Sequence, residues 1–191
     1  MDIEIKNLSI KKNEKTVFQD FSITFPENKI SALIAPSGWG KSTLLNYISE
    51  HFPKVSYAFQ DQRLLEQTTG LNNILFPLIN AGVKKDKNET IKYIYSEAEY
   101  FSIKDRLNEK CMNMSGGEKQ RINLMRSFLY PSQILLLDEP FQNLDSANIK
   151  NITEYAKKTH RKNPRTTVLV THSEKETENF CDYVFNFMPQ H

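Results

Sequence analysis

A short segment in the first quarter of the chain carries residue types that bind phosphate. Residues 35–43 read Ala-Pro-Ser-Gly-Trp-Gly-Lys-Ser-Thr, between an apolar run and a stretch suited to a helix. Backbone N–H groups of such a loop and the positive end of the helix surround a β-phosphate, and the lysine charge reaches the β- and γ-phosphates. We therefore expect this phosphate loop to bind a phosphorylated ligand through Pro36, Ser37, Gly38, Trp39, Gly40, Lys41, Ser42 and Thr43, with Ser42 also suited to Mg²⁺.

The alternative for this loop is a strand-to-helix turn with a surface lysine. The usual pattern begins with glycine, and Ala35 occupies that position, so the loop alone is a moderate signal. Two carboxylates at the end of the apolar run 134–137 weigh against the alternative, because ligands of α/β sheets collect at the carboxyl ends of strands. Asp138 suits a Mg²⁺ shell, and Glu139 can polarise an attacking water.

A third motif combines a helix cap with two glycines. Ser115 can cap a helix that begins at Gly116, and Glu118 can reach back to the Ser115 N–H, which forms a capping box. Gly116 and Gly117 leave backbone N–H groups exposed at the helix start, a ready anion site. A well-capped helix without a ligand is the alternative.

Apolar periodicity predicts an α/β framework around these motifs. Continuous apolar strands that alternate with helices indicate a largely parallel sheet covered on both faces. Residues 70–101 change to helical spacing, so a helical subdomain at roughly 65–130 is expected as an insertion in one domain, 1–191. The expected strands are 3–5, 21–25, 30–35, 55–59, 134–137, 168–170 and 184–187, the first two antiparallel; helices are expected at 43–48, 116–129, after Asp145 and after Ser173.

Composition excludes several classes of protein. With 39% hydrophobic and 25% charged residues the chain is ordinary for a globular domain, and its net charge of +2 gives no case for nucleic-acid binding. Cys111 and Cys181 lie far apart without metal-ligand spacing, which fits a reducing cytosol. The sequence shows neither a signal segment nor an apolar run long enough to span a membrane, so we expect any membrane role to be exercised from the water side.

The order of the motifs resembles that of the ATP-binding cassette (ABC) ATPase family over essentially the whole chain. In that family a phosphate loop, a Gln loop, a Ser-Gly-Gly signature, a hydrophobic strand with Asp-Glu, an Asp loop and a His loop follow one another. The matching residues here are Lys41, Gln60, Ser115 with Gly116 and Gly117, Asp138 with Glu139, Asp145, and His172.

The resemblance implies a fold and a mechanism. The fold would be a P-loop NTPase core, and two copies would sandwich two ATP molecules with Mg²⁺, each between the phosphate loop of one copy and the signature of the other. Glu139 would be the general base, and His172 would contact the γ-phosphate. Gln60 would sense Mg²⁺ or water, and Asp145 would cross the dimer interface. Integral membrane permease subunits would be the other partners, at the cytoplasmic side of the cell membrane.

The chain departs from the family pattern at the adenine site and leaves the direction of transport open. Lys12 stands where an aromatic residue usually stacks on adenine, and Phe18 is a possible substitute. Trp39 is expected to point outward, towards the second copy. The segment 59–65 resembles nitrate, sulfonate and taurine importer cassettes, whereas 76–82 is similar to lipoprotein-release and macrolide-export cassettes. The sequence favours a small-molecule importer over such an exporter, and both over an ABC ATPase acting on DNA or ribosomes.

Overall fold

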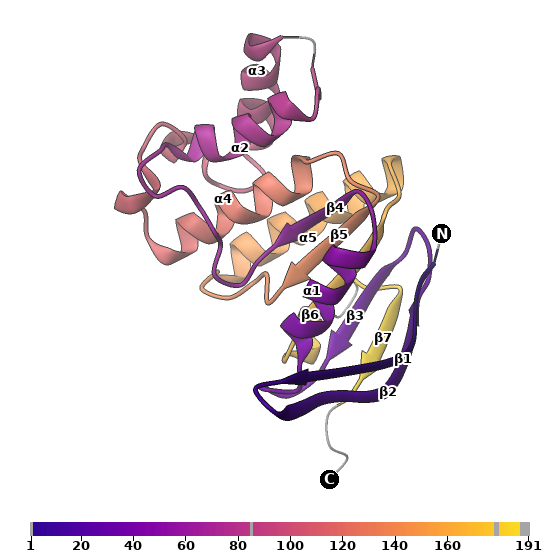
Figure 1. Cartoon of the computed structure of the whole chain (residues 1–191). Helices are drawn as coiled ribbons and strands as arrows, with labels where there is room; N and C mark the ends of the chain where they lie inside the picture. Colours follow the sequence, from indigo (N-terminus) through magenta and orange to yellow (C-terminus); the bar gives the residue numbers. More distant parts are fainter. Residues whose placement is uncertain (1, 85, 178–179, 188–191) are drawn as a thin grey trace.

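A five-stranded parallel sheet forms the centre of this computed structural model, which describes residues 2–84, 86–177 and 180–187 (Figure 1). Three of the strands are buried along their whole length, as their mainly apolar sequences predict. In spatial order the strands are β4 (Val55–Ala58), β5 (Ile134–Asp138), β6 (Thr166–Thr171), β3 (Ile30–Ile34) and β7 (Tyr183–Asn186).

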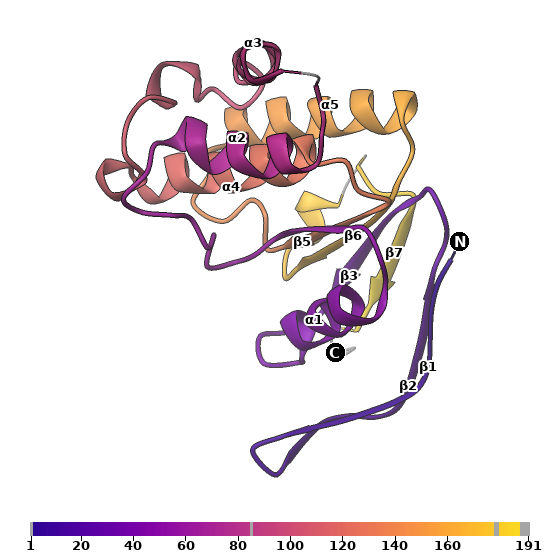
Figure 2. The same ribbon diagram turned by 45° about the horizontal axis from the view of Figure 1, so that its top comes forward.

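An antiparallel hairpin precedes the sheet. Strands β1 (Ile3–Lys12) and β2 (Lys15–Phe25) pair from Ile3 opposite Phe25 to Lys12 opposite Lys15. Their alternating side chains bury one face, which is the physical reason for the period of two in this part of the sequence. The hairpin lies on the same side of the sheet as α1 (Lys41–His51) (Figure 2).

Helices cover both faces of the sheet, so neighbouring residues of one strand belong to different cores. Leu136 packs with α1 and the hairpin, whereas Leu135 and Leu137 pack with the helices of the opposite face. Those helices are α2 (Gly70–Asn80), α3 (Lys87–Glu97), α4 (Gly116–Leu129) and α5 (Ser146–Lys162), as Figure 1 and Figure 2 show. The predicted α/β fold class, with a parallel sheet and N-terminal antiparallel strands, is confirmed.

One expected element is wrong. Instead of a helix after Ser173, the structure has a single 3₁₀ turn, Glu174–Glu176, and residues 178–179 lie outside the described part. The Thr171 hydroxyl hydrogen-bonds Glu176, so local side-chain contacts shape this turn. Two further 3₁₀ turns, Lys104–Arg106 and Cys111–Asn113, lead into α4. None of the helices in the described ranges is long and apolar enough to cross a membrane.

Parallel pairing brings the predicted site segments to one edge of the sheet. The phosphate loop follows β3, Glu139 follows β5, and His172 follows β6, and these strands are neighbours. The backbone N–H of Glu139 donates to Val170 O at 2.9 Å, and that of Ala35 donates to Thr171 O at 3.4 Å. The carboxyl ends of β3, β5 and β6 therefore form a common floor for a ligand.

Candidate nucleotide-binding site

The phosphate loop has the backbone geometry of an anion cradle. Gly38 (φ 78°) and Gly40 (φ 110°) adopt left-handed conformations, which L side chains rarely adopt. A Cβ on Gly40 would also lie 2.7 Å from Val17 Cγ1, so this position excludes any side chain. Gly40 is the N-cap of α1 and offers no side chain to its first N–H groups, which leaves them for an anion.

Ala35 replaces the first glycine of the pattern without backbone strain. It is absent from the residues with positive φ in the described chain, and it is fully buried at the end of β3. An alanine therefore fits where the usual glycine stands, because the turn of the chain does not need a left-handed residue there.

The Lys41 ammonium lies inside the curl of the loop. Its Nζ donates to Ala35 O at 3.0 Å and to Pro36 O at 3.2 Å, and only 6% of the residue is exposed. The same nitrogen is 3.5 Å from Glu139 Oε1. A buried cation held by two carbonyls and one carboxylate is suited to exchange these weak partners for phosphate oxygens.

Glu139 lies between the lysine and a histidine. Its Oε2 is 3.3 Å from His172 Nδ1, and the histidine side chain is largely exposed. The Glu139 backbone has φ 45°, an unusual value for a residue with a long side chain. Such strain is found where the surrounding structure holds a functional side chain in place. The structure thus brings together the Lys41, Glu139 and His172 that the sequence singled out.

Asp138 has the properties of a cation ligand. It is 3% exposed, and its Oδ1 has no hydrogen-bond partner within the described structure. Its Oδ2 accepts a 3.3 Å hydrogen bond from the Tyr57 hydroxyl, and the nearby Ser42 side chain also favours the charged carboxylate. Burial, with a contribution from the neighbouring Glu139, raises the pKa of Asp138 in spite of these two contacts.

A Mg²⁺ ion fits this arrangement. A buried carboxylate oxygen without a partner, beside a serine hydroxyl, is an incomplete set of oxygen ligands of the kind that Mg²⁺ completes with phosphates and water. The adjoining cavity of about 290 Å³ is lined by Ser42, Asn46, Tyr57, Phe59, Gln60, Asp61, Arg63 and Asp138.

The signature segment, Ser115–Gly117, lies elsewhere. Ser115 and Glu118 form the predicted capping box at the start of α4. A Cβ on Gly117 would lie 2.8 Å from Asn143 O, so the signature packs closely on the turn before Asp145, which caps α5. Within the described residues, no hydrogen bond or ion pair joins the signature to the phosphate loop of the same chain.

The aromatic residues near the loop do not follow the sequence predictions. Phe18 is 4% exposed and packs on Phe21 and Trp39, so it has no free face for adenine. Trp39 points into its own chain rather than outward, because its ring contacts Phe18, Phe21 and Phe187 at centroid distances of 4.8 to 5.5 Å. Lys12 is exposed at the end of the hairpin.

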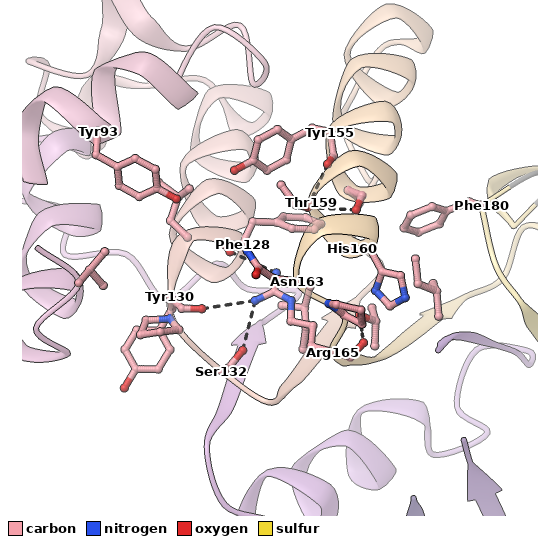
Figure 3. A pocket seen from close by; sticks show the side chains of 18 residues that line it. Tyr93, Phe128, Tyr130, Ser132, Tyr155, Thr159, His160, Asn163, Arg165 and Phe180 are labelled. Atoms are coloured by element: carbon pink, nitrogen blue, oxygen red, sulfur yellow. Dashed lines mark hydrogen bonds between the residues drawn. The ribbon is translucent and has the colours of Figure 1, made fainter. Parts of the chain in front are cut away.

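A second cavity, of about 350 Å³, lies among α3, α4 and α5 (Figure 3). Arg165 donates there to the carbonyls of Phe128 and Tyr130 and to Ser132 Oγ, as the dashed lines in part show. Burial lowers the pKa of Arg165 to about 10, so it stays charged at neutral pH. Its charge and N–H groups cap the carboxyl end of α4, the helix that carries the signature at its other end.

Comparison with known proteins decides the family. A family model described as "ABC transporter" matches residues 50–142. Over 202 residues the chain is 31% identical to the tungstate uptake system ATP-binding protein TupC of Peptoclostridium acidaminophilum, covering 96% of this chain and 93% of that protein. The chain belongs to the ABC transporter ATP-binding proteins. It is an ATPase cassette, and the residues above form its candidate nucleotide site.

Two further similarities support this assignment. The cassette is 31% identical over 187 residues to the lipoprotein-releasing system ATP-binding protein LolD of Geobacter metallireducens, covering 83% of this chain and 82% of that protein. Its fold matches the dimeric structure of MJ0796, described as a bacterial ABC transporter cassette, with a TM-score of 0.86, 24% identity and coverage of 98% and 94%. The structural likeness shows the fold.

Two contacts of the site were not predicted from the sequence. The Tyr57 hydroxyl on Asp138 follows from the parallel pairing of β4 with β5, which sets Tyr57 opposite Leu136, two residues before the carboxylate. Arg106, on a separate turn, donates from its Nε to Oε1 of Glu118, the residue after the signature, at 2.8 Å. The first contact could have been found from strand register, whereas the second has no local sequence signal.

Proposed function

We propose that two copies of the cassette bind two ATP molecules between them and hydrolyse the ATP to drive a membrane transporter. The observation that carries this proposal is the separation of two anion sites on one chain. Lys41, Glu139 and His172 meet at the phosphate loop, whereas the N–H groups at the start of α4 lie beside the Asp145 turn. A second copy can bring its signature to the first copy's phosphate loop, and the dimeric neighbour of the same fold is consistent with this.

In this proposal each residue of the chain has a distinct task. Glu139 accepts a proton from the attacking water, and its position between Lys41 and His172 keeps it aimed at the phosphate end of the loop. His172 donates to the γ-phosphate. Ser42 and Asp138, with Gln60 in the same cavity, would hold Mg²⁺, which neutralises phosphate charge when bound. Asp145 faces the second copy, where Gly116 and Gly117 bind the γ-phosphate.

We propose further that a permease docks beside the Gln loop. A groove of about 360 Å³ there is lined by Leu65, Asn72, Asn73, Phe76, Pro77, Asn80, Arg126 and Tyr130. Leu65 is 57% exposed and Phe76 45%, and both are apolar. Arg126, which lines the groove, donates to the carbonyls of Gln62 and Arg63. A permease that displaces Arg126 would therefore also displace the loop that carries Gln60. Residues 65–130 would then move as a helical subdomain, and the cassette would work at the cytoplasmic face of the membrane.

Uptake of a small molecule is the direction that we favour. One relative whose match covers 96% of the chain is named as the ATP-binding protein of a tungstate uptake system. Export is the second candidate, because the lipoprotein-releasing relative is equally similar over a shorter span. Reconstitution of the cassette with its permease in vesicles, with ATP on one side only, separates the two, since uptake and export move cargo in opposite directions.

The test of the central proposal uses Glu139→Gln in size-exclusion chromatography with ATP and Mg²⁺. Removal of the general base should slow hydrolysis by roughly 10²–10⁴-fold and trap the ATP-bound dimer. Addition of Ser115→Arg should abolish the dimer while leaving ATP binding intact, because it blocks the signature and not the phosphate loop. A Glu139→Gln chain that binds ATP and stays monomeric at high concentration would contradict the proposal.

A further inference from the structure

A carboxylate directly follows the two glycines of the signature. Residues 114–118 read Met-Ser-Gly-Gly-Glu, and Glu118 lies in the first turn of α4. Its side chain is 17% exposed, next to Gly117, whose N–H is one of the groups proposed to meet the partner's nucleotide. A negative charge so near a bound γ-phosphate weakens anion binding unless a cation neutralises it.

Arg106 supplies such a cation. Its Nε donates to Glu118 Oε1 at 2.8 Å, and its Nη1 donates to Glu109 Oε1 at 2.6 Å. The second oxygen of Glu118 accepts from the Ser115 backbone N–H at 2.8 Å. Both carboxylate oxygens are thus engaged, one in the helix cap and one with the guanidinium. The Ser115 backbone bond, and with it the Arg106 charge, lowers the pKa of Glu118.

The position of Arg106 is fixed by packing that does not involve Glu118. The residue closes the turn Lys104–Arg106, and the next residue, Leu107, is fully buried. The start of α2 holds this segment, because Leu71 N donates to Leu107 O at 2.7 Å and Gly70 N donates to Glu109 O at 3.0 Å. The packing of this turn on the start of α2 therefore places the guanidinium next to α4.

We infer that Arg106 is a positioning residue for the ATP sandwich, which neutralises Glu118 and holds the start of α4 in the form that accepts a phosphate from the second copy. This inference rests on the proposed function. The Arg106 charge allows the start of α4 to bind a phosphate although Glu118 carries a negative charge there, so Arg106 and Glu118 act as one unit. An isolated capping box would not need the arginine, because Ser115 and Glu118 satisfy each other.

The test is a double-mutant cycle in the Glu139→Gln chain, with the ATP-dependent dimer dissociation constant measured by analytical ultracentrifugation. The variants are Arg106→Gln, Glu118→Gln and both together. A partly exposed ion pair changes an equilibrium by about 1.5- to fivefold. The effects of the two pairs in a symmetric dimer multiply to about 2- to 25-fold, so Arg106→Gln should weaken the dimer by about tenfold. In a chain that already carries Glu118→Gln, adding Arg106→Gln should raise the dimer dissociation constant by less than about twofold.

Lys104→Gln is the matched control. It removes the same charge from the same turn, and Lys104 pairs instead with Glu99 at 2.6 Å, so the dimer should be unaffected. Arg106→Lys keeps the charge and should recover much of the lost affinity. The Arg106→Gln effect should also shrink in about 0.5 M salt, which screens charge and would leave a purely structural defect unchanged.

Two results would overturn the inference while leaving the proposed function intact. One is that Arg106→Gln weakens the dimer equally whether residue 118 is the native Glu118 or has been changed to glutamine. The arginine would then be a structural residue only. The other is a normal dimer in the Arg106→Gln chain. If no variant dimerises with ATP, including the parent Glu139→Gln chain, the proposed function fails and this inference falls with it.

Discussion

Asp138→Asn should stabilise the cassette in the absence of Mg²⁺ and nucleotide. The carboxylate is almost completely buried, its Oδ1 has no partner, and its charged form is disfavoured by burial. A buried unsatisfied acceptor costs about 1–3 kcal/mol, more when charged. An amide at this position removes the charge, while Tyr57 and Ser42 can each accept from its N–H groups. A gain of about 1–2 kcal/mol in the free energy of unfolding follows.

The magnitude can be read from thermal unfolding. For a chain of this length the entropy of unfolding is about 0.4 kcal/mol/K, so the gain corresponds to a rise in melting temperature of about 2–5 °C at pH 7.5 with EDTA. Asp182→Asn is the matched control, because Asp182 Oδ2 accepts from Ile30 N at 2.8 Å and an amide oxygen can replace it. The control should not raise the melting temperature.

The pH dependence of this gain has a defined sign. Because the pKa of Asp138 is raised in the folded protein, its ionisation destabilises the fold above that pKa and is relieved as the pH falls through it. The advantage of Asp138→Asn should therefore shrink as the pH falls from 7.5 towards about 4, where the unfolded carboxyl also becomes neutral. Mg²⁺ with ATP should stabilise the wild-type chain more than the variant. An Asp138→Asn chain that is less stable than wild type without Mg²⁺, or that gains as much stability as wild type from Mg²⁺ with ATP, would show that Asp138 is not an unsatisfied buried cation ligand.

Three further changes test other contacts. Tyr57→Phe removes a hydrogen bond from Asp138 and should raise the Mg²⁺ concentration for half-maximal ATPase by about tenfold, with the ATP dissociation constant nearly unchanged. Gly117→Ala sets a Cβ 2.8 Å from Asn143 O and should lower ATPase by about 10- to 100-fold while the monomer still binds ATP; normal turnover would show that the turn can move freely. Phe187→Ala should shift the emission of the single tryptophan to longer wavelength, and an unchanged spectrum would contradict the packing described.

Much of the fold could be predicted because its physical signals are local. The mainly apolar runs of β3, β5 and β6 reflect burial on both faces, and the alternation in β1 and β2 reflects burial on one. The prediction of a helix after Ser173 was wrong because the Thr171 and Glu176 side chains hydrogen-bond each other across a tight turn. The polar residue types in this segment do not indicate which of them will hydrogen-bond each other.

The site could be predicted as a set of motifs and less well as a set of contacts. Parallel strand order brings Lys41, Glu139 and His172 together, and strand ends are readable from sequence. Trp39 packs inward because Phe187, 148 positions later in the sequence, lies beside the phosphate loop. The same applies to Arg106, whose target is set by how its turn packs on α2. The direction in which such a side chain points depends on its tertiary neighbours rather than on its residue type.

A mixing experiment tests the composite site most directly. A Lys41→Ala chain has a defective phosphate loop, and a Ser115→Arg chain has a defective signature, so each alone should be inactive as an ATPase. When they are mixed in equal amounts, about half of the dimers are mixed, and each of those has one intact site. If the two sites act independently, the mixture should recover up to about a quarter of wild-type ATPase activity. A mixture as inactive as its parts, or a Ser115→Arg chain that is active alone, would contradict the composite site.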